Sequence, residues 1–141
     1  MPNKAITARQ RQQVRAKAGG CCEYCRSQEA FATERFSVDH IIPRAKGGQT
    51  ELANLAYACL GCNGYKYTHT QAIDPATAEF APLFHPRQQQ WADHFAWSAD
   101  LTQIIGLTPT GRATVQTLRM NRESLINLRK LLLLIDKHPP A

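Results

Sequence analysis

The chain has 141 residues, a length typical of one domain or of one small core with an extension, and its 43% hydrophobic and 20% charged residues exclude a disordered protein. A formal charge of +6 favours a polyanionic partner. No apolar signal segment follows the start, and the most apolar run, residues 125–135, is interrupted by Arg129 and Lys130. We therefore expect a cytoplasmic protein without a membrane span, whose cysteines are metal ligands or free thiols before they are disulfides.

Positive charge is concentrated at the beginning of the chain. Residues 1–26 contain six basic residues against Glu23 alone: Lys4, Arg9, Arg11, Arg15, Lys17 and Arg26. Thr7 and Gln10 have capping-box spacing and Gly19-Gly20 is a stop signal, which predicts a helix over residues 8–18. Its basic side chains either follow a phosphate backbone or form a solvated face.

The next part of the chain reads as two short strands, a loop and a helix. In order these are a strand within residues 34–40, a loop over 41–54, a strand at 55–58 and a helix from 60 past 66. Pro43 ends the first strand, and Gly47-Gly48 permit positive φ in the loop.

The chain changes character after residue 71, so we expect a core at residues 1–71 and an extension at 72–141 packed on it. Residues 72–88 are rich in Pro and turn formers, followed by predicted strands at 94–97 and 102–108 and helices at 109–120 and 122–137. Asn121 is the expected cap of the last helix. Four apolar residues are expected to cover one flank of the core: Trp91, Phe95, Trp97 and Ile104. The apolar last helix either packs there as well or forms a homodimer.

Four of the five cysteines form two Cys-x-x-Cys pairs, Cys22/Cys25 and Cys59/Cys62. Two such pairs are typical of a tetrahedral zinc site in which four thiolates leave no open coordination position. The alternatives are disulfides or unligated thiols. Cys21 either replaces Cys22 as a ligand or fills space beside the site. We predict a structural zinc ion that compensates for a small core.

Three side chains between and after these pairs suit a different chemistry. His40 has an ordinary pKa of ~6.5, so its neutral form can accept a proton from water. Asp39 and Asn63 offer oxygen atoms suited to a hard divalent cation such as Mg²⁺. Because Asn63 directly follows Cys62, a zinc ion would determine where its side chain points.

The ordered motif "VDHIIPRAKGG … NL … CLGCNGYK", preceded by "CEYC", resembles the HNH endonuclease family over residues 22–66. The resemblance implies an α+β protein with a ββα-metal core stapled by a four-cysteine zinc site. An N-terminal helix and a C-terminal extension of a hairpin and helices would surround this core. It also implies a metal-dependent endonuclease that hydrolyses DNA to 5′-phosphate and 3′-hydroxyl ends.

The resemblance implies a role for each motif residue. His40 would be the general base, Asn54 would hold the loop that orients it, and Asp39 with Asn63 would bind one Mg²⁺ or Mn²⁺ ion. Nucleic-acid contacts are expected from Arg44, Lys46, Lys66, Arg11, Arg15 and Lys17. Plainer alternatives remain for several of them: Asp39 as a strand-end cap, Asn54 as a turn residue, and Arg44 and Lys46 as solvated charges. His69 lies near the motif but outside the family's spacing, so we expect it at the surface, and His85, His94 and His138 have no evident partner.

Two other functions compete with DNA cleavage. A non-catalytic, zinc-stabilised module would bind nucleic acid through the same charges, but it leaves Asp39, His40 and Asn63 together unexplained. A partner-binding protein would use the extension, with the core as its scaffold.

Overall fold

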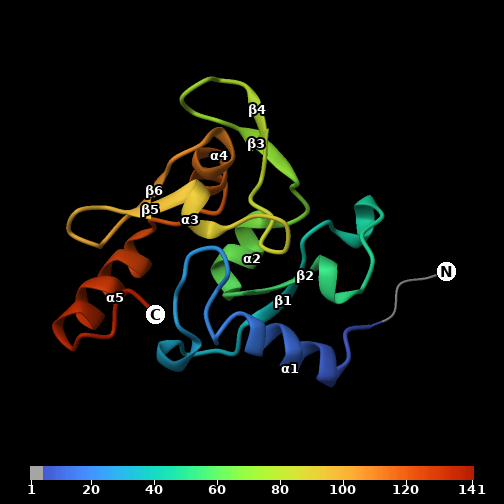
Figure 1. Cartoon of the computed structure of the whole chain (residues 1–141), viewed down its shortest axis with the longest axis horizontal. Helices are drawn as coiled ribbons and strands as arrows, with labels where there is room; N and C mark the ends of the chain where they lie inside the picture. Colours follow the sequence, from blue (N-terminus) through green and yellow to red (C-terminus); the bar gives the residue numbers. More distant parts are fainter. Residues whose placement is uncertain (1–4) are drawn as a thin grey trace.

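A computed structural model describes residues 5–141, so Lys4 of the basic segment lies outside the described residues. Helices and short antiparallel strands give the predicted α+β fold (Figure 1). The elements are α1 (Ala8–Lys17), β1 (Ser37–His40), β2 (Leu55–Ala58), α2 (Leu60–Lys66), β3 (Gln71–Ile73), β4 (Phe80–Pro82), α3 (Trp91–His94), β5 (Phe95–Trp97), β6 (Ile104–Gly106), α4 (Pro109–Thr117) and α5 (Glu123–Leu134). Across residues 5–141, no helix has the length and apolar character that crossing a membrane requires.

Helix α1 forms as its local signals predict. Thr7 Oγ1 accepts a hydrogen bond from the Gln10 amide at 3.0 Å, and Gln10 Oε1 accepts one from the Thr7 amide at 3.0 Å. Gly19 and Gly20 have φ of +63° and +71°, which ends the helix. The predicted capping box and stop signal are therefore both confirmed.

Strands β1 and β2 form an antiparallel pair followed closely by α2. His40 lies opposite Leu55 in the register, and all four residues of β2 are buried. Strand β1 begins later than predicted because side chains satisfy the backbone of Phe36: its amide donates to Glu29 at 2.8 Å, and its carbonyl accepts from Arg11. The strand pair and α2 together form the ββα unit that carries the motif.

The extension also contains a hairpin that the sequence did not indicate. Strands β3 and β4 pair where only turns were expected. Their turn is held by Asp74, which accepts from the Ala76 amide at 3.0 Å and forms two bonds of 2.9 Å with Arg112 of α4. Because Arg112 is distant in sequence, no local signal predicts this hairpin.

The later elements agree with the prediction except for α3 (Trp91–His94), which was not expected, and for the cap of α5. Strands β5 and β6 pair, and α4 and α5 follow. Asn121 was expected to cap α5, but this is wrong: its side chain accepts from the Ile104 amide at 2.7 Å and donates to the Ile104 carbonyl at 2.8 Å. Arg122 occupies the N-cap position, without a side-chain cap. Asn121 therefore completes the backbone bonding of β6.

The two hairpins, α3 and α4 of the extension lie on the opposite side of β1, β2 and α2 from α1 (Figure 1). Phe95 and Ile104 belong to the same buried cluster as core residues, and Trp91 and Trp97 pack against it. Arg87 donates to the Leu55 carbonyl at 2.9 Å. Core and extension therefore share one apolar interior.

Helix α5 packs rather than standing free. Leu125, Leu132 and Arg129 are buried, and the Arg129 guanidinium donates to the carbonyls of Thr102 and Met120. Leu131, Leu134 and Ile135 remain exposed on the helix and its end.

Candidate active site and metal centre

The four cysteines of the two pairs meet in one buried cluster. The sulfur atoms of Cys22, Cys25, Cys59 and Cys62 all lie within 4.8 Å of one another. The Cys25 and Cys59 sulfurs are 3.7 Å apart, beyond a disulfide bond of about 2.0 Å. Four sulfurs placed 2.3 Å from one ion in a tetrahedron would lie about 3.8 Å apart. The donor set and its spacing therefore fit a zinc ion.

Both pairs present their sulfurs in the same way. Cys22 Sγ accepts from the Cys25 amide at 3.4 Å, and Cys59 Sγ accepts from the Cys62 amide at 3.4 Å. Cys59 is also the N-cap of α2, so the cluster holds the start of that helix. Cys21 lies outside the cluster, with its thiol donating to the Gly19 carbonyl at 3.7 Å.

Asp39, on β1, belongs to a buried cluster of polar side chains. Only 5% of the residue is exposed; its Oδ2 accepts from the Tyr24 hydroxyl at 2.8 Å and pairs with Lys66 Nζ at 3.0 Å. Burial raises the pKa of Asp39 above its ordinary value, and the Lys66 charge opposes that rise. Asn63, one turn before Lys66 on α2, is half-buried.

His40 ends β1 and is partly open to solvent. Its Nε2 lies 2.9 Å from Thr50 Oγ1, which also accepts from Arg44 at 3.4 Å. Burial lowers the pKa of His40, Arg44 and Lys66 lower it further, and Asp39 partly offsets these effects. The neutral form of the imidazole is therefore favoured at pH 7.

Asn54 closes the loop that follows His40. Its Nδ2 donates to the carbonyls of Ile42 at 3.0 Å and Gln49 at 2.9 Å, and its Oδ1 accepts from the Ile42 amide at 2.8 Å. A Cβ atom at Gly48 would lie 1.7 Å from the Ile42 carbonyl oxygen, so only glycine permits this approach. Of the two glycines, only Gly47 has a positive φ, of +87°.

Residues 22–68 match the family model described as HNH endonuclease, which spans the cysteine cluster, Asp39, His40 and Asn54. Over these residues the chain is similar to HNH endonucleases, and we call them the HNH segment. No curated protein and no solved structure matches the chain. The HNH segment covers about a third of the chain, so the extension lies outside the family model.

The structure corrects the expectation for Lys66 of the HNH segment. The side chain was expected to reach a phosphate, but only 1% of it is exposed. Besides the pair with Asp39, Nζ donates to the carbonyls of Ile41 at 2.9 Å and His40 at 3.3 Å. The ammonium is therefore fully engaged inside the HNH segment and is not a phosphate contact.

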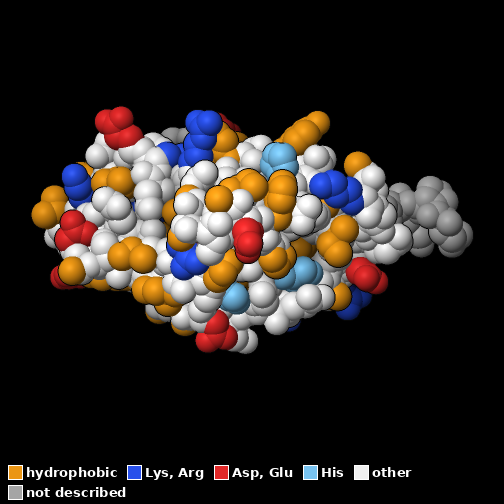
Figure 2. All heavy atoms as spheres, turned by 90° about the horizontal axis from the view of Figure 1, so that it is seen from above, with side chains coloured by type: hydrophobic (Ala, Val, Ile, Leu, Met, Phe, Trp, Pro, Cys, Tyr) orange, Lys and Arg blue, Asp and Glu red, His pale blue; other side chains and the backbone are white. Residues whose placement is uncertain are grey.

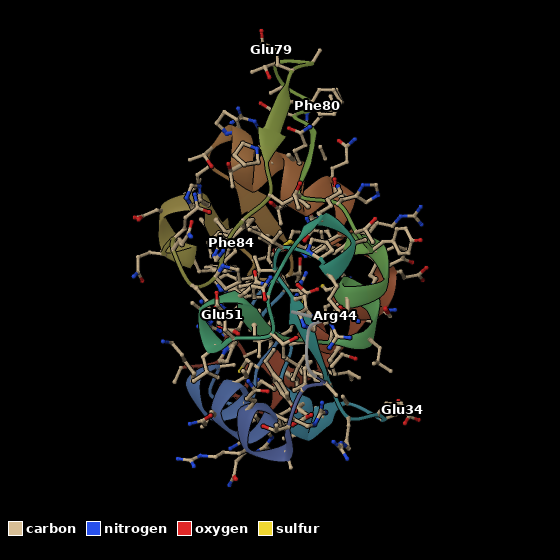
Figure 3. The ribbon with its side chains drawn as sticks, turned by 90° about the vertical axis from the view of Figure 1, so that its right-hand side faces the viewer. Glu34, Arg44, Glu51, Glu79, Phe80 and Phe84 are labelled. Carbon is tan, nitrogen blue, oxygen red and sulfur yellow. The ribbon has the colours of Figure 1, made fainter. Side chains whose placement is uncertain are left out.

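The other basic residues that were expected to contact nucleic acid differ in their contacts within the chain and in their exposure. Arg11 donates to the Phe36 carbonyl and lies over the Tyr57 ring, and Arg15 pairs with Glu29 at 2.7 Å. Arg44, Lys46 and Lys17 are exposed, with Arg44 on the loop after β1 (Figure 3). On the face seen in Figure 2, Lys and Arg side chains are scattered among apolar ones. The basic residues thus do not gather into a stripe on that face.

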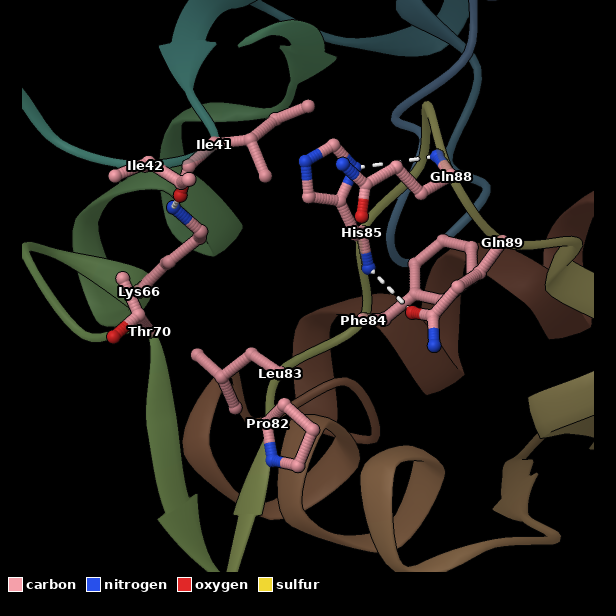
Figure 4. Close-up of a pocket in the computed structure, with 10 residues that line it drawn as sticks. All are labelled: Ile41, Ile42, Lys66, Thr70, Pro82, Leu83, Phe84, His85, Gln88 and Gln89. Carbon is pink, nitrogen blue, oxygen red and sulfur yellow. Dashed lines mark hydrogen bonds between the residues drawn. The ribbon is translucent and has the colours of Figure 1, made fainter. Parts of the chain in front are cut away.

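His85 of the extension lies beside the HNH segment, which sequence reasoning did not anticipate. Its Nδ1 accepts from the amides of Arg87 and Gln88 at 3.3 Å, and its ring faces a pocket of about 340 Å³ (Figure 4). The pocket is lined by Ile41, Ile42, Lys66, Thr70, Pro82, Leu83, Phe84, His85, Gln88 and Gln89. The pocket forms where residues 82–89 meet Ile41, Ile42, Lys66 and Thr70, which are distant in sequence, so no local sequence signal predicts it.

Replacing Asn54 by alanine is expected to loosen the loop over residues 42–49. The change leaves three backbone groups without their partner, at a cost of about 1–3 kcal/mol in the free energy of unfolding. Urea denaturation measures this loss, and hydrogen exchange of the Ile42 amide locates it. An unchanged exchange rate at Ile42 would show that the Asn54 side chain does not hold this loop. Gln49→Ala, which leaves the carbonyl contact in place, is the control.

Proposed function

We propose that this chain is an endonuclease that hydrolyses phosphodiester bonds of DNA with the help of a divalent cation. The observation that carries the proposal is a neutral, partly exposed His40 held beside a clamped loop within the HNH segment. A zinc ion bound by the four cysteines would keep the ββα unit in place. Nucleic-acid binding is what membership of this family implies.

His40 would act through the nitrogen that Thr50 does not hold. If Nε2–H donates to Thr50 Oγ1, Nδ1 keeps its lone pair and takes the proton of the attacking water. Asn54 would serve this step indirectly, because it fixes the start of the loop directly after His40. Thr50 and Asn54 are thus positioning residues for one base.

Asp39 and Asn63 are the residues that would hold the divalent cation. A carboxylate and an amide oxygen are donors that Mg²⁺ and Mn²⁺ accept. Once bound, the cation would stabilise the charge that develops on the phosphate and the leaving oxygen. Lys66 already pairs with the Asp39 carboxylate. A cation bound there must therefore either share the carboxylate with the Lys66 ammonium or displace that ammonium.

Supercoiled plasmid DNA tests the proposal, with Mg²⁺, Mn²⁺ or no added cation. We expect nicked and linear products only with added cation, and a much higher cation requirement for Asp39→Asn. Zinc content and circular dichroism must match between the proteins. A chelator alone does not serve as the control, because it also strips structural zinc. Cleavage that needs no cation, or an Asp39→Asn protein with the wild-type cation requirement, would refute the cation's role.

A non-catalytic nucleic-acid-binding module is the second candidate, and the Lys66–Asp39 pair is the observation in its favour. An ammonium that neutralises the carboxylate removes the charge a divalent cation needs. This candidate predicts DNA binding that weakens steeply with salt and no cleavage with any cation. The plasmid assay and a binding titration therefore separate the two.

A further inference from the structure

The zinc centre described above has a neighbour from outside the HNH segment. Arg122, at the start of α5, directs its guanidinium at two of the four sulfurs. Its Nη2 lies 3.4 Å from Cys59 Sγ, and its Nη1 lies 3.7 Å from Cys62 Sγ. Both cysteines belong to the second pair, about 60 residues earlier in the chain.

The guanidinium is fixed in this position by other contacts. Nη1 also donates to the carbonyls of Leu118 at 3.3 Å and Arg119 at 3.2 Å, which close the turn after α4. The guanidinium carbon lies 5.8 Å from the centre of the Tyr65 ring on α2. Arg122 is thus held from the side of the extension and from the side of the HNH segment.

Gly61, between Cys59 and Cys62, provides the space for this contact. A Cβ atom on Gly61 would lie 2.4 Å from Arg122 Nη2. Any larger residue would push the guanidinium away from the sulfurs. The second cysteine pair and Arg122 therefore fit each other sterically.

The positive charge of Arg122 lies beside the negative charge of the cysteine thiolates. Four thiolates around Zn²⁺ carry a net charge of −2, and all four cysteines are buried. Such a charge in a protein interior is costly without a counter-charge and hydrogen-bond donors. Arg122 supplies one positive charge and two N–H donors directed at sulfur.

We propose that Arg122 is a positioning residue of the zinc centre, through which the C-terminal extension retains the metal and holds the start of α2. The inference rests on the proposed occupancy of the four-cysteine site by zinc. It makes the extension part of the metal centre and not merely a cover for the core.

Zinc release into a chromophoric chelator, under conditions that keep the protein folded, measures this role in the full-length chain. We expect release from Arg122→Gln to be about 10–100-fold faster than from wild type, the usual range for loss of an outer hydrogen bond to a metal ligand. Arg119→Gln is the matched control, since Arg119 lies over the same Tyr65 ring at 4.7 Å with no contact to sulfur in the structure. Arg122→Lys keeps the charge and should recover part of the retention.

Gly61→Ala supplies an independent variant that leaves all charges intact. Its methyl group would displace the guanidinium, so it should accelerate release as Arg122→Gln does and add little in the double variant. In cobalt-substituted protein, the thiolate-to-metal absorption bands should shift in both variants and not in Arg119→Gln.

The possible results distinguish the role of Arg122 from the occupancy of the four-cysteine site by zinc. A wild-type protein without a stoichiometric metal would overturn the zinc site itself. Wild-type protein with zinc, but equal release rates and cobalt spectra in wild type and Arg122→Gln, would overturn the role of Arg122 alone. Additive effects of Gly61→Ala and Arg122→Gln would also count against it.

Discussion

Alanine in place of His40 is expected to lower the rate of plasmid cleavage by about 10²–10⁴-fold, the usual contribution of a positioned general base. His40 ends β1, is partly exposed, and its side chain forms a hydrogen bond of 2.9 Å with Thr50, so its loss should leave folding and zinc content intact. The measurement is the initial rate of nicking at saturating Mg²⁺. His69→Ala is the matched control, because His69 is an exposed histidine three residues after the buried Lys66.

The pH dependence of the wild-type rate provides a second readout for His40. Burial, Arg44 and Lys66 lower its pKa below the ordinary 6.5, and the base works only when neutral. The rate should therefore rise with pH, with a midpoint below pH 6.5. A midpoint above pH 7, or equal cleavage by wild type and His40→Ala, would assign the base to another group.

Serine in place of Cys22 is expected to abolish cooperative folding. Structural zinc sites contribute an apparent ~10–16 kcal/mol of binding free energy, comparable to the ~5–15 kcal/mol stability of a whole domain. The cluster joins the segment after α1 to the first turn of α2, so its loss should release both. Thermal melting followed by circular dichroism, together with metal analysis, measures the effect.

Cys21→Ser is the matched control, because Cys21 adjoins Cys22 in sequence but lies outside the sulfur cluster. It should retain one zinc per chain and melt close to wild type. A Cys22→Ser protein with one bound zinc and a wild-type melting curve would show that the cluster is not a structural zinc site.

Local signals in the sequence determined the elements that carry the motif. The Thr7–Gln10 box and Gly19-Gly20 bound α1, and the two cysteine pairs mark the metal cluster. Each signal acts over a few residues, through backbone hydrogen bonds and φ preferences that neighbours in sequence decide. The order of these signals was therefore enough to identify the HNH segment and its α+β fold.

The tertiary structure alone decided where the charged side chains point. Lys66 turns inward to Asp39, and Asp74 builds a hairpin with Arg112. Arg122 reaches the cysteine sulfurs across about 60 residues of chain. A sequence shows that such a side chain is charged, but its partner is chosen by burial, because a charge removed from water must find a counter-charge or a donor wherever the fold provides one.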